Sequence, residues 1–189
     1  MAPMRTLALG AALLLSAACA HLPKTPAQAL PPLRLAPSAL GCELALQQQL
    51  QFRFGAQARA LDALLEADAG EVRLLVQALG QSGVQLHWNG RELQQQRASW
   101  LPPAVRGERV LDDLQFTLWP AAAIRAALPA GWTLEEHAGR RALRQAGSDW
   151  LVARRIDAQT LELENRAEGY ALRVASAQPL PENCAGAAW

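Results

Sequence analysis

Three cysteines occupy positions in this 189-residue chain where their side chains are expected to react. The first, Cys19, directly follows the segment Leu15-Ser16-Ala17-Ala18. A basic start at Arg5, an apolar run over residues 7–15 and a cut site of small residues are typical of a secretory signal. A cysteine immediately after such a site is typical of a lipobox. The pattern therefore predicts a signal peptide over residues 1–18 and acylation of Cys19 by palmitate-type chains.

Acylation of Cys19 would anchor the protein without spanning the membrane. The apolar run over residues 7–15 is shorter than the roughly 20 residues that a spanning helix needs. Two or more acyl chains hold stably, because each buried CH₂ contributes about 0.8 kcal/mol. Ala20 stands where an inner-membrane retention signal has aspartate, so we expect a lipid-anchored protein on the periplasmic face of the outer membrane. The alternative is an ordinary cleaved signal followed by an incidental cysteine.

The other two cysteines, Cys42 and Cys184, lie near opposite ends of the remaining chain. Disulfides persist in exported proteins, so these two residues are candidates for a bridge that joins the terminal segments. The alternative is two separate thiols. Neither cysteine has histidines or further cysteines near it in the sequence, so we expect no metal site.

Residues that could catalyse a reaction are sparse. A hydrolase needs a serine within reach of a histidine that a carboxylate orients. Ser82 lies in Gly80-Gln81-Ser82-Gly83, which lacks the spacing of a nucleophile elbow. Asp112 and Asp113 are adjacent in a predicted helix, so they point in different directions, and we expect them on a solvated face. The sequence therefore predicts a protein that is not an enzyme; a periplasmic esterase is a distant third alternative.

Composition limits the class of protein further. The formal net charge of +1 comes with dispersed charges and no basic patch, so no nucleic-acid partner is expected. Prolines at 23, 26, 31, 32 and 37 favour an extended spacer, which predicts a tether over residues 19–40. The remainder, residues 41–189, suits a single domain with a sizeable core.

Alternating apolar and polar residues predict strands in the first half of this domain. The pattern is clearest between Cys42 and Phe54, where Leu44, Leu46 and Leu50 share one face. Asn89-Gly90 is a signal for a two-residue hairpin. The expected strands cover residues 42–54, 60–67, 72–79, 84–88 and 91–97.

The period becomes helical after Pro103 and then returns to two. Apolar residues recur at helical spacing from Val110 to Leu118, and a second short helix follows Trp119-Pro120 and ends at Leu128. Strands are expected again at residues 132–136, 140–145, 150–156, 160–165 and 170–175. A meander with one apolar face must pack a second layer or curl around an interior. The pattern leaves open whether that interior is filled or holds a ligand.

Two segments carry a resemblance to a known family. They are the stretch from Leu74 to Gly80 and the longer stretch Leu118-Trp119-Pro120 through Trp132, which contains a tryptophan–proline helix. With the lipobox, they resemble DUF3261-type proteobacterial lipoproteins, which are found near genes for aryl-polyene synthesis. That family is similar in turn to the lipoprotein carriers LolA and LolB.

The resemblance implies a mainly β fold, in which a curved antiparallel sheet forms an unclosed half-barrel and short helices plug its concave face. It also implies an apolar cavity for acyl chains, and a periplasmic carrier protein as a partner. Apolar side chains suit such a cavity because removing acyl surface from water drives binding. The side chains expected to line it are Leu74, Val76, Leu86, Trp88, Leu114, Trp119, Ile124, Trp132, Trp150 and Val152. The alternative for each is an ordinary place in a filled core.

These observations predict a lipoprotein that binds or receives an acyl or polyene-type lipid, or the lipid moiety of a lipoprotein, without bond chemistry and without a cofactor. The alternative is a structural or assembly lipoprotein that acts through a protein partner. The state of the interior separates the two hypotheses, because carriage needs an open apolar cavity and a scaffold needs none.

Overall fold

A computed structural model describes residues 29–101 and 105–184. Its strands form one ten-stranded antiparallel sheet in the order β5-β4-β3-β2-β1-β10-β9-β8-β7-β6. Each half of the chain is a meander, and the first and last strands join the two halves. The strands are β1 (Leu44–Phe54), β2 (Gln57–Ala67), β3 (Val72–Ala78), β4 (Gln81–Trp88), β5 (Leu93–Arg97), β6 (Trp132–His137), β7 (Arg140–Gln145), β8 (Ser148–Arg155), β9 (Thr160–Asn165) and β10 (Tyr170–Ser176).

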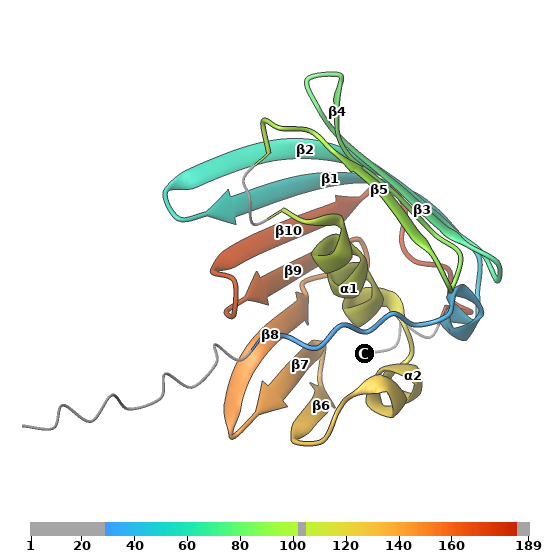
Figure 1. The fold of residues 1–189 in the computed structure, drawn as a ribbon, viewed down its shortest axis with the longest axis vertical. Helices are drawn as coiled ribbons and strands as arrows, with labels where there is room; N and C mark the ends of the chain where they lie inside the picture. The colour runs from blue at the N-terminus through green and yellow to red at the C-terminus, as the bar shows by residue number, and fades with distance from the viewer. Residues whose placement is uncertain (1–28, 102–104, 185–189) are drawn as a thin grey trace, which may run out of the picture.

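Two helices separate the two meanders. α1 (Gly107–Leu118) and α2 (Ala121–Ala127) follow each other directly, and a short 3₁₀ helix, η1 (Pro37–Leu40), precedes β1. Figure 1 shows the strongly curved, unclosed sheet with α1 lying within its concave side. The predicted mainly β fold, with a curved antiparallel sheet and short helices, is therefore confirmed.

The alternation in the sequence explains which face of the sheet is buried. In β1, Leu46, Leu50 and Phe52 are buried, whereas the residues between them are mostly exposed. Register places Leu50 beside Leu61 of β2 and beside Val174 of β10. Because alternate side chains of a strand point to the same face, this register continues one apolar surface across the centre of the sheet.

The predicted two-residue hairpin at Asn89-Gly90 was wrong in length. Trp88 pairs with Leu93, so four residues form the connection between β4 and β5. The Asn89 side-chain oxygen accepts hydrogen bonds from the backbone N–H groups of Arg91 and Glu92, at 3.0 and 2.8 Å. This capping of the turn by asparagine competes with the tighter turn that the dipeptide favours.

The tether predicted over residues 19–40 was wrong for its C-terminal part. Leu30, Leu33, Leu35 and Leu40 are buried and belong to the hydrophobic core. Figure 1 shows this segment, in blue, running across α1 towards β1. Its prolines set an extended backbone, but alternate leucines give that backbone an apolar face, which packs instead of remaining solvated.

A disulfide joins Cys42, just before β1, to Cys184. The two cysteines are 142 residues apart in the sequence. The bridge ties the segment after β10 to the start of β1, the two strands that pair at the middle of the sheet.

Candidate functional site

A cavity of about 140 Å³ is lined by residues of the sheet and of α1. Most of its wall is aliphatic, and the wall is built from both meanders, α1 and the segments flanking them. The apolar residues that line it are Leu50, Phe52, Leu61, Ala63, Leu74, Val76, Val84, Leu101, Val105, Val110, Leu114, Leu118, Ala158, Leu161, Leu163, Leu172, Val174 and Leu180.

Strand register gives the cavity two polar ends. At one end Gln48 lies opposite Ser176, and its side-chain amide donates to the serine hydroxyl at 3.0 Å. Arg155, Gln159 and Thr160 line the wall near this end. The hairpin between β9 and β10 lies at the other end of these strands.

The second polar end combines that hairpin with α1. Arg106, Arg109, Asp113 and Tyr170 line the cavity there. Arg109 and Asp113 share one face of α1 because they are four residues apart. The interior is thus an apolar space between two polar ends.

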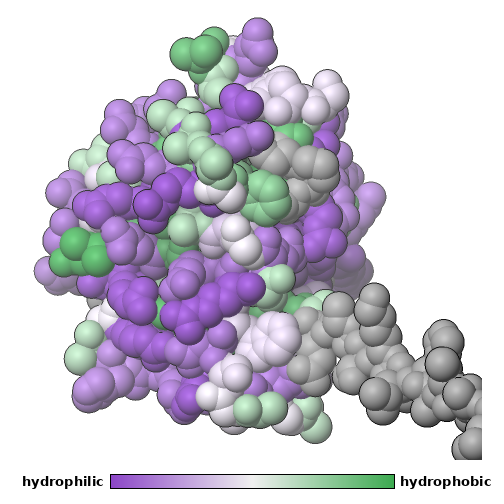
Figure 2. All heavy atoms as spheres, turned by 90° about the vertical axis from the view of Figure 1, so that its left-hand side faces the viewer, coloured by the Kyte–Doolittle hydropathy of each residue, from purple (hydrophilic) through white to green (hydrophobic). Residues whose placement is uncertain are grey.

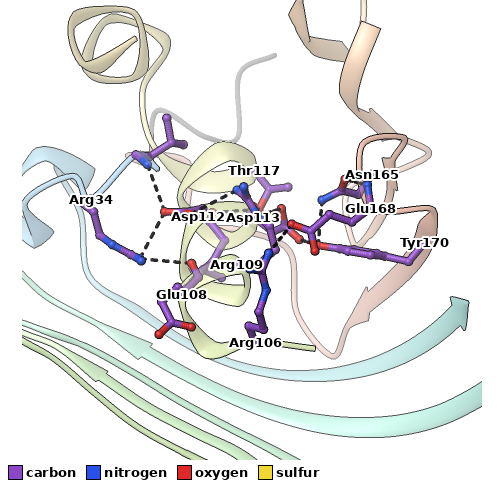
Figure 3. A network of polar contacts seen from close by, with 12 residues as sticks. Arg34, Arg106, Glu108, Arg109, Asp112, Asp113, Thr117, Asn165, Glu168 and Tyr170 are labelled. Carbon is purple, nitrogen blue, oxygen red and sulfur yellow. Dashed lines mark hydrogen bonds and ion pairs between the residues drawn. The ribbon is translucent and has the colours of Figure 1, made fainter. Parts of the chain in front are cut away.

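A buried network organises this second end (Figure 3). Arg109 Nε donates to Asp113 Oδ1 at 3.0 Å. The Tyr170 hydroxyl donates to Asp113 Oδ2 and accepts from Asn165 Nδ2, the latter at 3.0 Å. Asp113, Asn165 and Tyr170 are all buried, so the network fixes α1 to the hairpin between β9 and β10.

Burial determines how these groups titrate. Desolvation raises the pKa of Asp113 to about 6, although Arg109 and the Tyr170 hydrogen bond act in the opposite direction. Desolvation and the Asp113 charge raise the pKa of Tyr170 above its ordinary value. Tyr170 therefore stays protonated and donates to the carboxylate in the neutral range.

The placement of Asp112 and Asp113 corrects a prediction. We expected both on a solvated face, but Asp112 is 4% exposed and Asp113 is 7% exposed. Asp112 Oδ1 accepts from the Leu33 backbone N–H at 3.1 Å and pairs with Arg34 at 3.3 Å. The helix is covered on two sides, by the sheet and by the N-terminal segment, so neighbouring carboxylates that point in different directions are both buried.

The N-terminal segment holds α1 from the side away from the cavity. Gln115 accepts from the Leu35 N–H at 2.9 Å and donates to the Leu35 carbonyl at 2.8 Å. The indole N–H groups of Trp88 and Trp119 donate to the carbonyls of Leu35 and Ala36, at 2.8 and 3.0 Å. We call residues 30–36 the strap, because they lie across α1 and hydrogen-bond to it.

The C-terminal end of α1 is held by an arginine from the sheet. Arg141 on β7 is 1% exposed, and its Nη1 donates to the carbonyls of Phe116 and Trp119 at 2.7 and 2.9 Å. Its Nε donates to Glu136 at 2.7 Å. A cation at this end satisfies the helix's last carbonyls and opposes the negative end of the helix dipole.

Comparison with models of protein families shows which family this chain belongs to. The family model described as a protein of unknown function, DUF3261, matches residues 45–178. The chain belongs to the DUF3261 family. The matched region begins at the second residue of β1 and ends two residues after β10, so it contains the rest of the sheet and both helices α1 and α2.

Among solved structures, this DUF3261 protein is similar to a DUF1329 family protein from Desulfovibrio piger. The two share 8% sequence identity with a TM-score of 0.38, over 71% of this chain and 83% of that chain. A comparison with curated proteins gave no match.

Of the ten side chains expected to line a cavity, the structure brings three to it. Leu74 and Val76 lie on β3, and Leu114 lies on α1. The other seven lie outside the lining, so their assignment to it was wrong: Leu86, Trp88, Trp119, Ile124, Trp132, Trp150 and Val152.

Those seven residues have structural environments of other kinds. Leu86, Trp88, Trp119, Ile124 and Val152 are buried. Trp132 and Trp150 pack edge to face, with ring centroids 5.8 Å apart. The cavity lining includes Val84 of β4 and Arg155 of β8, so membership of a strand does not separate Leu86, Trp88 or Val152 from it. Periodicity identifies apolar positions but not their distance from the cavity.

Sequence reasoning missed the residues at the polar end of the cavity. Arg109, Asp113 and Thr117 recur every four residues along α1, and all three line the cavity. This spacing is a signal of one helical face. It would have identified the face, but only the structure shows that Tyr170 lies opposite it.

Two kinds of predicted or possible site remain to be placed: a metal site and the acylated cysteine. No group of three or more histidine, cysteine, aspartate or glutamate side chains is placed to hold a metal ion among residues 29–101 and 105–184. Cys19, the predicted site of acylation, lies outside the described residues.

Proposed function

We propose that this DUF3261 protein is a lipid-anchored periplasmic lipoprotein that binds an acyl chain between its sheet and α1. The observation that carries the proposal is the cavity, whose wall includes aliphatic side chains from β1, β2, β3, β4, β9, β10 and α1. Transfer of an acyl chain into such a space is favourable by about 25 cal/mol for each Å² of apolar surface removed from water. No bond is made or broken in this activity.

The size of the cavity indicates what part of a lipid it takes. Typical small-molecule sites have volumes of about 300–1,000 Å³. At about 140 Å³, this cavity suits one segment of an acyl chain in the present conformation. The resemblance to LolA and LolB supports a role in donating or accepting acyl chains, with a carrier protein as the partner. The predicted lipobox supports attachment to the outer membrane.

Ala63 offers a direct test of the cavity. It is buried at the centre of β2 and lines the cavity, so a larger side chain there would occupy the space. A cavity of about 150 Å³ accommodates a benzene ring. Ala63→Phe should therefore fill the cavity and abolish acyl binding. Ala60→Phe is the matched control, because Ala60 is on the same strand but is exposed on the opposite face.

The measurement uses the full chain in lipid nanodiscs with a photoactivatable acyl probe, and mass spectrometry maps the adducts. We expect adducts on cavity-lining peptides in the wild type and in Ala60→Phe, and none in Ala63→Phe. Thermal unfolding of each variant accompanies the mapping. A wild-type protein without cavity adducts, or a probe that labels Ala63→Phe equally, would reject acyl binding and favour a scaffold role through a protein partner.

A further inference from the structure

One nitrogen at the polar end of the cavity lacks a hydrogen bond. Arg109 is 4% exposed and lines the cavity. Its Nε is used by Asp113, but its Nη2 has no hydrogen-bond acceptor among the described residues. Asp112 Oδ2 forms an ion pair with Nη2 at 3.6 Å, which is beyond hydrogen-bond distance. A buried donor left unsatisfied costs about 1–3 kcal/mol, so an oxygen acceptor supplied by a ligand would be favoured here.

The charges around Arg109 determine which acceptor fits. Two buried carboxylates, Asp112 and Asp113, flank this one guanidinium. The next cations, Arg34 and Arg106, are already paired, with Asp112 and Glu168 respectively. A ligand carboxylate would add a third negative charge in a region of low dielectric, where like charges repel strongly. A neutral carbonyl accepts the same hydrogen bond without adding charge.

Apolar residues of the cavity lining lie beside Arg109. Val110 and Leu114 follow Arg109 on α1, and Phe52 and Leu172, which pair across β1 and β10, lie in the opposite wall. A chain attached to a carbonyl at Arg109 would therefore enter the aliphatic space.

We propose that the cavity recognises an uncharged acyl ester or amide, whose carbonyl oxygen accepts a hydrogen bond from Arg109 Nη2. This assignment rests on the proposed acyl binding and narrows its ligand class. It excludes the free fatty-acid anion as the preferred ligand. Arg109 is a binding residue in this proposal, and Asp113 positions it.

Competition against the photoactivatable acyl probe tests the preference. The full chain in nanodiscs is incubated at about pH 8, where a free carboxyl is ionised, with methyl decanoate, decanoate or decane. The amount of each competitor in the bilayer is measured and expressed per lipid, so that differences in partitioning do not enter the comparison. We expect methyl decanoate to compete about tenfold better than either other compound, because only it offers a neutral acceptor.

The alternative outcomes separate the two proposals. Decanoate competing as well as the ester, or decane competing equally, would overturn carbonyl recognition while leaving acyl binding intact. A probe that labels no cavity peptide would overturn both.

Arg109→Lys provides the variant arm of the test. Lysine keeps a cation beside Asp113 but removes the guanidinium nitrogens, so the preference for ester over decane should disappear while decane still competes. Arg173→Lys is the matched control, since Arg173 is exposed, pairs with Glu162 and lies outside the cavity lining, and it should retain the preference. A preference that survives Arg109→Lys would contradict the assignment, and the wild-type competition remains decisive if that variant does not fold.

Discussion

Arg141 places a positive charge inside the domain, where few charges are found. Desolvation lowers its pKa to about 10, and Glu136 opposes that change. The side chain remains charged in the neutral range and bridges β6, β7 and the end of α1. Its role is to fix the helix that forms one wall of the cavity.

Replacing this arginine should be costly. Arg141→Met would leave the Phe116 and Trp119 carbonyls without their donor and Glu136 without its buried partner. We expect a loss of about 3–5 kcal/mol in the free energy of unfolding, measured by urea denaturation. Arg144→Met is the control on the same strand: its side chain is more exposed, and we expect a midpoint near that of the wild type. Equal effects of the two substitutions would argue against the bridging role.

Asp113 makes stability depend on pH. Its pKa is about 6 when folded and 3.8 in its ordinary environment, so the folded state binds the proton more tightly. The contribution of Asp113 to stability therefore increases as the pH falls through 6 and is complete below 3.8. Two units of pKa correspond to a change on the order of 3 kcal/mol.

The pH dependence can be isolated with Asp113→Asn, which cannot titrate. The unfolding free energy of the wild type minus that of the variant should increase as the pH falls from 7 to about 4. Urea denaturation across this range measures it. A flat difference would show that Asp113 titrates normally.

At the scale of elements, the strap and the disulfide together explain how α1 is kept in the half-barrel. The strap covers α1 through Leu33 and Leu35, which hydrogen-bond to Asp112 and Gln115. The disulfide holds Cys42, at the end of the same N-terminal segment, against Cys184. Both terminal segments are thus integral parts of the domain.

Removing the disulfide should destabilise the domain without changing its fold. A bridge across 142 residues contributes about 5 kcal/mol by the chain-entropy argument, and measured losses for native bridges are about 2–5 kcal/mol. The double variant Cys42→Ser and Cys184→Ser should lower the urea midpoint and keep the far-ultraviolet circular dichroism spectrum. An unchanged midpoint would show that the packing of the strap alone holds the termini.

For the molecule as a whole, apolar surface is gathered inside. Large hydrophobic side chains exposed among the described residues are Leu64, Leu79 and Ile156. On the face in Figure 2, hydrophilic residues predominate and hydrophobic ones are scattered. In the described part of the chain, no helix has the length and apolar character needed to cross a membrane.

Attachment to a membrane is predicted to depend on Cys19. Cys19→Ala should prevent incorporation of a clickable palmitate analogue and cleavage at the lipobox. Fractionation of cells measures attachment to the membrane, and label that remains on the protein after treatment with base measures acylation. The double cysteine variant Cys42→Ser and Cys184→Ser is the matched control and should still incorporate the label. Labelling that persists in Cys19→Ala would place the acyl chain elsewhere.

The sequence by itself determined the strands, both helices and their order. These elements follow from local rules: the alternation from Leu44 to Phe54 and the helical spacing from Val110 to Leu118 need no knowledge of distant contacts. The curved half-barrel was inferred by resemblance to a family and not from the pattern of residues.

Only the tertiary structure decided which residues meet. Apolar periodicity identified Leu74, Val76 and Leu114 but could not separate them from Trp88 or Ile124, because distance from the cavity depends on strand order and curvature. Asp113 was expected in solvent, since an isolated helix has a free face. It is buried because the sheet and the strap cover α1 on two sides, and burial is a property of the assembled layers.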